Sequence, residues 1–234
     1  MQSMGFRKIE SAAVEAPFEA QSKLLANREV RTIFDVGANI GQTARRYRRW
    51  FKNADVWSFE PLPDTYAELE ATHAGDRKVH ARREAVGAEV GRAVFHVNAK
   101  NYNHSLLGAA DGGDQYAAID HVGEIEVPVT TVDAFCEEQG IETLDILKTD
   151  AEGADLLALQ GARKMLSEHR IGLVFCEVLF VPIFEGQASF NELMAYLEPF
   201  GYGLHDLYGH HHGDDGRLIM ANGLFVGPRV TGRA

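Results

Sequence analysis

The sequence predicts an α/β fold built on a mostly parallel sheet, because short β-like runs alternate with segments whose apolar residues recur at helical spacing. The β-like runs are TIFDVG (32–37), DVWSFE (55–60), KVHARR (78–83), LDILKTD (144–150) and GLVFCEV (172–178). The expected helices cover about 42–51, 63–73, 132–139, 154–167 and 190–198. Strands joined by helices in this way lie parallel, and right-handed crossovers place helices on both faces of the sheet.

The C-terminal part of the sequence predicts a hairpin. Two β-like runs, 200–208 and 217–227, are joined by GHHHGDD, so we expect them to return antiparallel at the edge of the sheet. His210, His211 and His212 fall in this connection. Because consecutive positions do not bring several rings onto one tetrahedral site, we expect a solvent-exposed loop here instead of a zinc centre.

Two further segments lie outside the alternating pattern. The β-like runs 92–97 and 124–132 enclose a long, glycine-containing stretch of weak periodicity. Loops of this length in compact domains are usually functional or disordered, so residues 98–124 are expected to form a lid loop. Residues 11–27 have an amphipathic helical pattern, which predicts that residues 1–29 form a helical cover for the sheet or for a cofactor.

Length and composition indicate one domain, 1–234. With 45% hydrophobic residues, a chain of 234 residues can bury one sizeable core. A net charge of -11 would repel a phosphate backbone, so nucleic acid is not expected as a partner. The chain has neither an apolar run long enough to span a bilayer nor a signal-peptide pattern, which predicts a cytoplasmic protein. Cys136 and Cys176 each lie in an apolar segment, where reduced, buried thiols are expected.

The stretch IFDVGANIG (33–41) is the first candidate for a binding site. In open α/β sheets, ligands bind beyond the carboxyl end of a strand, where the chain turns into the next helix. Gly37 and Gly41 permit a tight turn and a close approach of backbone, and Asn39 tolerates positive φ. The helix N-terminus near Gly41 offers free N–H groups to a carboxylate, and Asp35 can hold an ammonium group.

The same stretch argues against a dinucleotide. The pattern G-x-G-x-x-G would require glycine at 39 and glycine or alanine at 42, where this chain has Asn39 and Gln42. Glu60 ends the second β-like run, where a carboxylate can accept hydrogen bonds from ribose hydroxyls. A glycine turn with an acid on the second strand and without the pyrophosphate glycines favours S-adenosylmethionine. The structural alternative is an ordinary turn followed by an ordinary strand-end acid.

Collinear motifs carry a resemblance to a known family. They are IFDVGANIGQT (33–43), VWSFEPLPDTYAELE (56–70), EAVGAEVGRAVFHV (84–97), LDILKTDAEGADLLALQGARKML (144–166) and FCEVLF (175–180). In these stretches the sequence resembles the FkbM family of S-adenosylmethionine-dependent methyltransferases. The resemblance implies a Rossmann-like class I methyltransferase fold with a mostly parallel seven-stranded sheet, and methyl transfer to a hydroxyl of a sugar, glycan or other small molecule.

The resemblance also implies a set of cofactor contacts. Residues expected at the methionyl portion are Asp35, Gly37, Asn39 and Gly41, with Ala38 and Thr43 in the same turn and Asp150 opposite it. Glu60, followed by Pro61, is expected at the ribose, and Glu84 and Ala85 are expected at the adenine.

Acidic residues at the ends of two later strands are the candidates for catalysis. An alcohol acceptor needs a general base or a divalent metal ion that lowers the pKa of its hydroxyl. Asp150 and Glu177 are placed to take the proton, and together with Glu152 they form a candidate site for Mg²⁺ or a similar cation. His104 in the expected lid is a further candidate base. A structural alternative exists for Glu152, because Thr149 and Glu152 have the spacing of a helix capping box.

Two alternative functions remain open at this point. One is a nicotinamide-dependent oxidoreductase on the same kind of fold, which Asn39 and Gln42 disfavour. The other is a non-catalytic module that binds the cofactor as a sensor or scaffold. Self-association into a homo-oligomer is compatible with both and with a methyltransferase.

Overall fold

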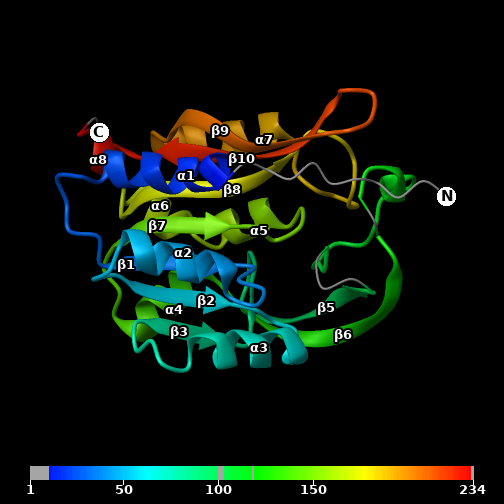
Figure 1. The fold of residues 1–234 in the computed structure, drawn as a ribbon, viewed down its shortest axis with the longest axis horizontal. Coiled ribbons are helices and arrows are strands. Elements are labelled where there is room, and N and C mark those ends of the chain that lie inside the picture. The colour runs from blue at the N-terminus through cyan, green and yellow to red at the C-terminus, as the bar shows by residue number, and fades with distance from the viewer. Residues whose placement is uncertain (1–10, 100–102, 118, 233–234) are drawn as a thin grey trace.

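The computed structural model describes residues 11–99, 103–117 and 119–232 and confirms the α/β architecture. A seven-stranded sheet has the order β3-β2-β1-β7-β8-β10-β9 (Figure 1). Its strands are β1 (Thr32–Val36), β2 (Asp55–Phe59), β3 (Val79–Arg82), β7 (Leu144–Thr149), β8 (Ile171–Leu179), β9 (Gly203–His212) and β10 (Leu218–Val226). The first five strands of that order run parallel, and β10 pairs antiparallel with both β8 and β9, as the predicted hairpin requires.

Helices cover both faces of the sheet because neighbouring side chains of each strand point to opposite sides. On β1, Phe34 and Val36 pack in the core shared with α4 (Val132–Gln139), α5 (Asp155–Gln160), α6 (Arg163–Ser167) and α7 (Phe190–Leu197). Ile33 points the other way, into the core under α1 (Ser11–Leu24) and α2 (Gln42–Trp50), the two helices at the front of Figure 1. The remaining helices are α3 (Pro63–His73), α8 (Pro228–Thr231) and the 3₁₀ turns η1 (Gly113–Gln115) and η2 (Glu198–Phe200).

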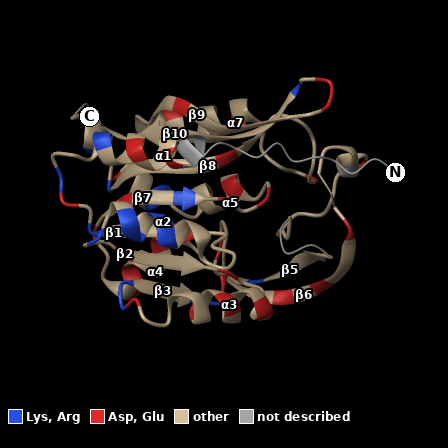
Figure 2. Cartoon of the chain, viewed as in Figure 1, with Lys and Arg blue, Asp and Glu red and all other residues tan. Residues whose placement is uncertain are grey.

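The basic residues near 45–50 form the outer face of α2, which Figure 2 shows in blue. Tyr47 is fully buried against Phe18 of α1, with ring centroids 5.2 Å apart. Arg49 reaches outward to Glu15, at 3.0 Å between Nη2 and Oε1, and Arg48 reaches Asp76 at 2.8 Å between Nε and Oδ2. Their charges are therefore satisfied by acids of the same chain.

A second, three-stranded sheet is the main feature that the sequence did not predict. It consists of β4 (Ala85–Val86), β5 (Gly91–Asn98) and β6 (His121–Thr130), in the order β4-β6-β5. The two long strands extend past the end of the large sheet toward which β2 and β7 point (Figure 1). The expected lid is consequently shorter than 98–124, because Asn98 and residues 121–124 belong to strands.

Two other expectations about local structure were wrong. The three consecutive histidines lie at the end of β9 and not in the turn, although all three are exposed as expected. The helix expected at 154–167 is divided into α5 and α6 at Gly161, where an added Cβ would lie 2.1 Å from the carbonyl oxygen of Gly87. Asp133 of α4 stabilises this break, because its carboxylate accepts hydrogen bonds from the N–H groups of Lys164 and Met165 at the start of α6.

Part of the segment predicted as an N-terminal cover is helical, and its role as a cover for the sheet or a cofactor stays a prediction. Helix α1 ends at Leu24, and the first ten residues of the predicted cover lie outside the described part of the chain. Cys136 and Cys176 are buried and free, as predicted. In the described ranges, no helix has the length and apolarity that a membrane crossing requires.

Candidate active site

The carboxyl ends of β1, β2 and β7 meet at one edge of the sheet, where a cavity opens. The parallel register aligns Val36 with both Phe59 and Thr149, so the residues that follow these strands come together. The cavity is lined from the strand ends by Gly37, Asn39, Glu60 and Asp150, and from the segment after β5 by His104 and Leu106. This is the position that the sequence predicted for a ligand.

The turn after β1 depends on its two glycines. Gly37 has φ +70°, and an added Cβ would lie 1.9 Å from the carbonyl oxygen of Asp150. Gly41 has φ +87°, and an added Cβ would lie 2.4 Å from Nε2 of His73. Asn39, with φ 48°, is the left-handed residue between them. The predicted tight turn is confirmed, and Gly37 lets it approach the end of β7 directly.

A buried lysine holds this turn to β7. Nζ of Lys148 lies 2.9 Å from Oδ1 of Asp35 and donates hydrogen bonds to the carbonyl oxygens of Val36 at 3.0 Å and Gly37 at 3.1 Å. Asp35 is completely buried and does not line the cavity. Burial raises the pKa of Asp35, although the ammonium of Lys148 opposes that shift. Burial also lowers the pKa of Lys148, but Asp35 and Asp150 raise it by more, so the lysine stays charged.

Glu60 connects the turns after β1 and β2. Its Oε2 accepts a hydrogen bond from the backbone N–H of Asn39, and its Oε1 accepts one from the N–H of Leu62, each at 3.0 Å. Only 6% of the residue is exposed, and burial raises the pKa of its carboxyl to about 7. Glu60 therefore faces the cavity with both oxygens fixed in position and with spare lone pairs for a ligand.

Four acids gather behind and beside the cavity, from β7 to β8. Asp150 and Glu152 line it, whereas Asp155 and Glu177 are buried and do not. Burial is the largest cause of a raised pKa at Glu152, Asp155 and Glu177, and repulsion from neighbouring carboxylates adds to it in each case. The ammonium of Lys148 opposes the rise in pKa at each of these three carboxyls. The site therefore favours a ligand that brings positive charge.

The capping box predicted around Glu152 is not formed, and the metal site predicted there stays a prediction. Thr149 donates its hydroxyl hydrogen bond to Asp155, and α5 begins at Asp155 with no side-chain cap. Glu152 has φ 52°, outside the helix. Asp150, Glu152 and Glu177 do not bring their ligand atoms within 4.8 Å of one another in the described structure, as three ligands of one ion would.

The segment after β5 closes one side of the cavity. Nδ1 of His104 accepts a hydrogen bond from the N–H of Asn98 at 3.0 Å, and burial lowers the pKa of its imidazole. The neutral ring must then carry its proton on Nε2, which makes that atom a donor. Ser105 holds the segment to the cavity wall, because its hydroxyl donates to the carbonyl oxygen of Glu152 at 2.7 Å.

Comparison with known proteins now identifies the family. The model of the methyltransferase FkbM domain matches residues 35–204, nearly three quarters of the sequence. The chain belongs to the FkbM methyltransferase family.

Two curated relatives and two solved structures agree with this assignment. The chain is 25% identical over 175 residues to 2-O-methyltransferase NoeI of Sinorhizobium fredii. This alignment covers 72% of this chain and 71% of that protein. It is also 25% identical over 142 residues to Methyltransferase 1 of Beauveria bassiana, across 55% of this chain and 57% of that protein.

Two solved structures have a similar fold. The METTL16 MTase domain superposes with a TM-score of 0.54 at 9% identity, over 94% of this chain and 70% of that one. EvdMO1 superposes with a TM-score of 0.50 at 10% identity, over 99% of this chain and 44% of the EvdMO1 chain. These likenesses establish a class I S-adenosylmethionine-dependent methyltransferase fold.

The cavity of this FkbM domain contains most of the residues that the sequence singled out, but not all of them. Lining it are Gly37, Asn39, Glu60, Pro61, Ala85, His104, Asp150 and Glu152. Away from its lining are Asp35, Ala38, Gly41, Thr43, Glu84 and Glu177, whose direct roles stay predictions. Glu84, for example, is paired with Arg82 at 3.1 Å between Oε1 and Nε.

Several lining residues of the FkbM domain were missed. Gln42, Val86, Phe95 and Leu106 also face the cavity. Phe95 carried a usable signal, since it is the inward position of an alternating run on β5. Lys148 does not line the cavity, and its role in holding the turn was not predicted, because a buried lysine within a strand cannot be told from an exposed one without its partners.

Proposed function

We propose that this protein is an S-adenosylmethionine-dependent O-methyltransferase whose acceptor is a hydroxyl group of a small molecule, such as a sugar, a glycan or a specialised metabolite. Family membership supplies the reaction class, and the relative named as a 2-O-methyltransferase supports oxygen as the acceptor atom. One observation carries the proposal for this chain. The glycine turn, the fixed carboxylate of Glu60 and the acids Asp150 and Glu152 line a single cavity with His104.

The cavity suggests how the cofactor would lie. Glu60 would accept hydrogen bonds from the ribose hydroxyls, and the apolar side chains of Val86 and Phe95 would contact the adenine. Gly37 and Asn39 would lie against the methionyl portion. The surplus of carboxylates would compensate the ammonium and sulfonium charges.

Glu152 is the proton acceptor that fits this geometry best. When bound, S-adenosylmethionine would supply an electrophilic methyl carbon to the acceptor oxygen, with cleavage of the sulfur–carbon bond and release of neutral S-adenosylhomocysteine. The hydroxyl proton then needs a base. His104 presents a donor at Nε2, so it would hold the acceptor oxygen by a hydrogen bond. A carboxyl group with a raised pKa is better matched to taking the proton near neutral pH.

A divalent cation at Asp150, Glu152 and Glu177 stays a prediction. No step is assigned to one, because these three side chains are not among the described groups whose ligand atoms all lie within 4.8 Å of one another. The metal hypothesis keeps a direct test, which is turnover after exhaustive chelation. A cytoplasmic location, the absence of a nucleic-acid partner and self-association all stay predictions.

The proposal is tested first by calorimetric titration with S-adenosylmethionine, S-adenosylhomocysteine and NAD. We expect micromolar binding of the first two and none of NAD; NAD binding alone would overturn the proposal in favour of an oxidoreductase. Mass spectrometry of a panel of hydroxylated sugars and metabolites then follows methyl transfer from isotopically labelled cofactor. Cofactor binding without transfer to any acceptor would support the non-catalytic alternative instead.

A further inference from the structure

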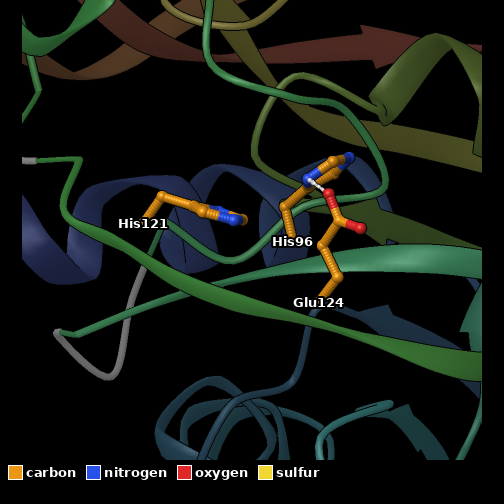
Figure 3. Close-up of side chains that lie close together, drawn as sticks. All are labelled: His96, His121 and Glu124. Atoms are coloured by element: carbon orange, nitrogen blue, oxygen red, sulfur yellow. Dashed lines mark ion pairs between the residues drawn. The ribbon is translucent and has the colours of Figure 1, made fainter.

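Three side chains of types that can bind a metal come together in the three-stranded sheet, and none of them belongs to the lining of the cavity. They are His96 on β5 and His121 and Glu124 on β6. One potential ligand atom of each lies within 4.8 Å of the other two, and in the described ranges this is the one group of its kind. Figure 3 shows the ring of His121 pointing toward His96, which is paired with Glu124.

An irregularity in the strand pairing brings His121 to the same face as its partners. His96 lies directly opposite Glu124 in the antiparallel ladder. His121 is three positions before Glu124, so regular alternation would place it on the other face. The register shifts between Val97, which pairs with Gly123, and Asn98, which pairs with His121, leaving one extra residue on β6. Bulges of this kind redirect a side chain, and here the redirected side chain is an imidazole.

The observed spacing fits a transition-metal ion. At Zn²⁺ bond lengths of about 2.0–2.2 Å and tetrahedral angles, two ligand atoms lie about 3.3–3.6 Å apart. Nδ1 of His96 is 3.3 Å from Oε1 of Glu124. The His121 side chain is exposed, and its ring centroid lies 5.8 Å from that of His96, so a bound ion would require a rotation of this exposed side chain. Two imidazoles and one carboxylate favour Zn²⁺, Co²⁺ or Ni²⁺ over Mg²⁺ or Ca²⁺, which prefer oxygen ligands.

We propose that His96, His121 and Glu124 form a binding site for a transition-metal ion of the Zn²⁺ type. The site lies at the base of the segment 99–120, where the N–H of Ala99 donates to the carbonyl oxygen of Asp120 at 2.8 Å. His96 also exchanges two backbone hydrogen bonds with Ser105, at 2.8 and 3.2 Å. Ser105 in turn is bonded to Glu152 at the cavity. A bound ion would therefore fasten the segment that carries His104 and Leu106.

The site is tested by titrating Zn²⁺ into the protein, prepared without an affinity tag and free of metal. We expect one equivalent of Zn²⁺ to bind. Mg²⁺ at the same concentration should bind no better to the unmodified protein than to variants that lack one of the three side chains. Three variants each remove one proposed ligand: His96→Asn, His121→Asn and Glu124→Gln. Each should weaken Zn²⁺ binding by about 10-fold to 100-fold or more, because even residues that only hydrogen-bond to a metal ligand have effects of that size. His121 and Glu124 are exposed, so these two variants are expected to fold normally.

Matched controls separate this site from adventitious binding. His210→Ala with His212→Ala removes an exposed pair of stacked imidazoles elsewhere, and Glu126→Gln removes an exposed carboxylate of β6 outside the cluster. Both controls should bind Zn²⁺ as the unmodified protein does. Hydrogen exchange should also slow at the amides of His96 and Ser105 when Zn²⁺ is added. Failure of Zn²⁺ to bind, or equal binding by any of the three site variants, would overturn the proposal whether or not methyl transfer occurs.

Discussion

Glu60 shows how one side chain can serve both the fold and a ligand. Its two oxygens accept the N–H groups of Asn39 and Leu62, so it fixes the backbone that surrounds the cavity before any ligand arrives. Lys148 acts in the same way from the opposite side, on the carbonyl oxygens of Val36 and Gly37. The turn after β1 is therefore held through the N–H of Asn39 on one side and through carbonyl groups on the other, and a preorganised site of this kind loses less entropy on binding.

Replacing Glu60 tests the ribose contact. Glu60→Gln should weaken the binding of S-adenosylmethionine about 10-fold to 100-fold, because hydrogen bonds to a charged group contribute about 1.5–3 kcal/mol. With a pKa of about 7, the unmodified protein should also lose affinity as the pH falls from 8 to 6, since a protonated carboxyl accepts fewer hydrogen bonds. Calorimetry at both pH values measures this. Glu68→Gln, which changes an exposed acid of α3, is the control, and equal affinity in both variants would contradict the assignment.

Replacing Glu152 tests the proton acceptor. Glu152→Gln should lower kcat by about 10²-fold to 10⁴-fold, the usual contribution of a general base, and change the Kd of the cofactor little. Because burial raises the pKa of Glu152, kcat of the unmodified enzyme should rise with pH above the ordinary range of a glutamate. In Glu152→Gln, kcat should not show this rise with pH. Glu185→Gln, at an exposed acid that does not line the cavity, should keep the full rate, and a normal kcat in Glu152→Gln would leave the acid without a catalytic role.

At the level of elements, the turn between β1 and α2 was predictable and its surroundings were not. The spacing of Gly37, Asn39 and Gly41 reports a local backbone requirement, which a sequence shows directly. Asp35 looked the same as an exposed strand-end acid, because its burial depends on Lys148, more than a hundred positions away. The expected capping box was wrong for a similar reason: it requires a helix that starts just after Thr149, whereas α5 begins at Asp155 and Glu152 has φ 52°, which spacing alone does not reveal.

The large sheet was predictable because its strands alternate with helices, whereas the small sheet breaks that rule. Strands β5 and β6 were recognised as β-like, yet the sheet also includes β4, which pairs with β6 and, at two residues, is too short to produce a sequence pattern. The pairing of β5 with β6 also contains a bulge, because β6 has one extra residue opposite the step from Val97 to Asn98. A bulge has no fixed sequence signature, so the grouping of His96 with His121 was visible only in three dimensions.

Gly37→Ala tests the close approach of the turn to β7. Positive φ costs a residue with a Cβ about 1–2 kcal/mol, and the clash with the carbonyl oxygen of Asp150 should add about 1–3 kcal/mol. Denaturant unfolding should therefore show a loss of about 2–5 kcal/mol. Gly75→Ala is the matched control, since an added Cβ there meets no atom within 4 Å. Equal stabilities of the two variants would show that the turn can move away from β7 without cost.

Over the whole molecule, the buried acids should make the free energy of unfolding fall as the pH rises. Glu60, Glu152, Asp155 and Glu177 all have pKa values raised by burial, so between pH 5 and 8 the folded state binds more protons than the unfolded chain. Each acid contributes its full stabilisation at pH values below its pKa in the unfolded chain. That stabilisation is lost as the pH rises through its pKa in the folded protein. Glu60, shifted from 4.5 to about 7, should account for about 3 kcal/mol. His104, whose pKa is lowered, acts in the opposite direction but is a single group.

Denaturant unfolding of the ligand-free protein at pH 5, 6, 7 and 8 measures this dependence. We expect a loss of several kcal/mol from pH 5 to pH 8, and a smaller loss in Glu60→Gln, in which one of these contributions is absent. Saturating S-adenosylmethionine should also flatten the profile, because its positive charges favour the ionised carboxylates and so bind more tightly where the free protein is weakest. A stability that rises from pH 5 to pH 8 would mean that these acids ionise at ordinary pKa values, and the cationic complementarity of the cavity would then lose its support.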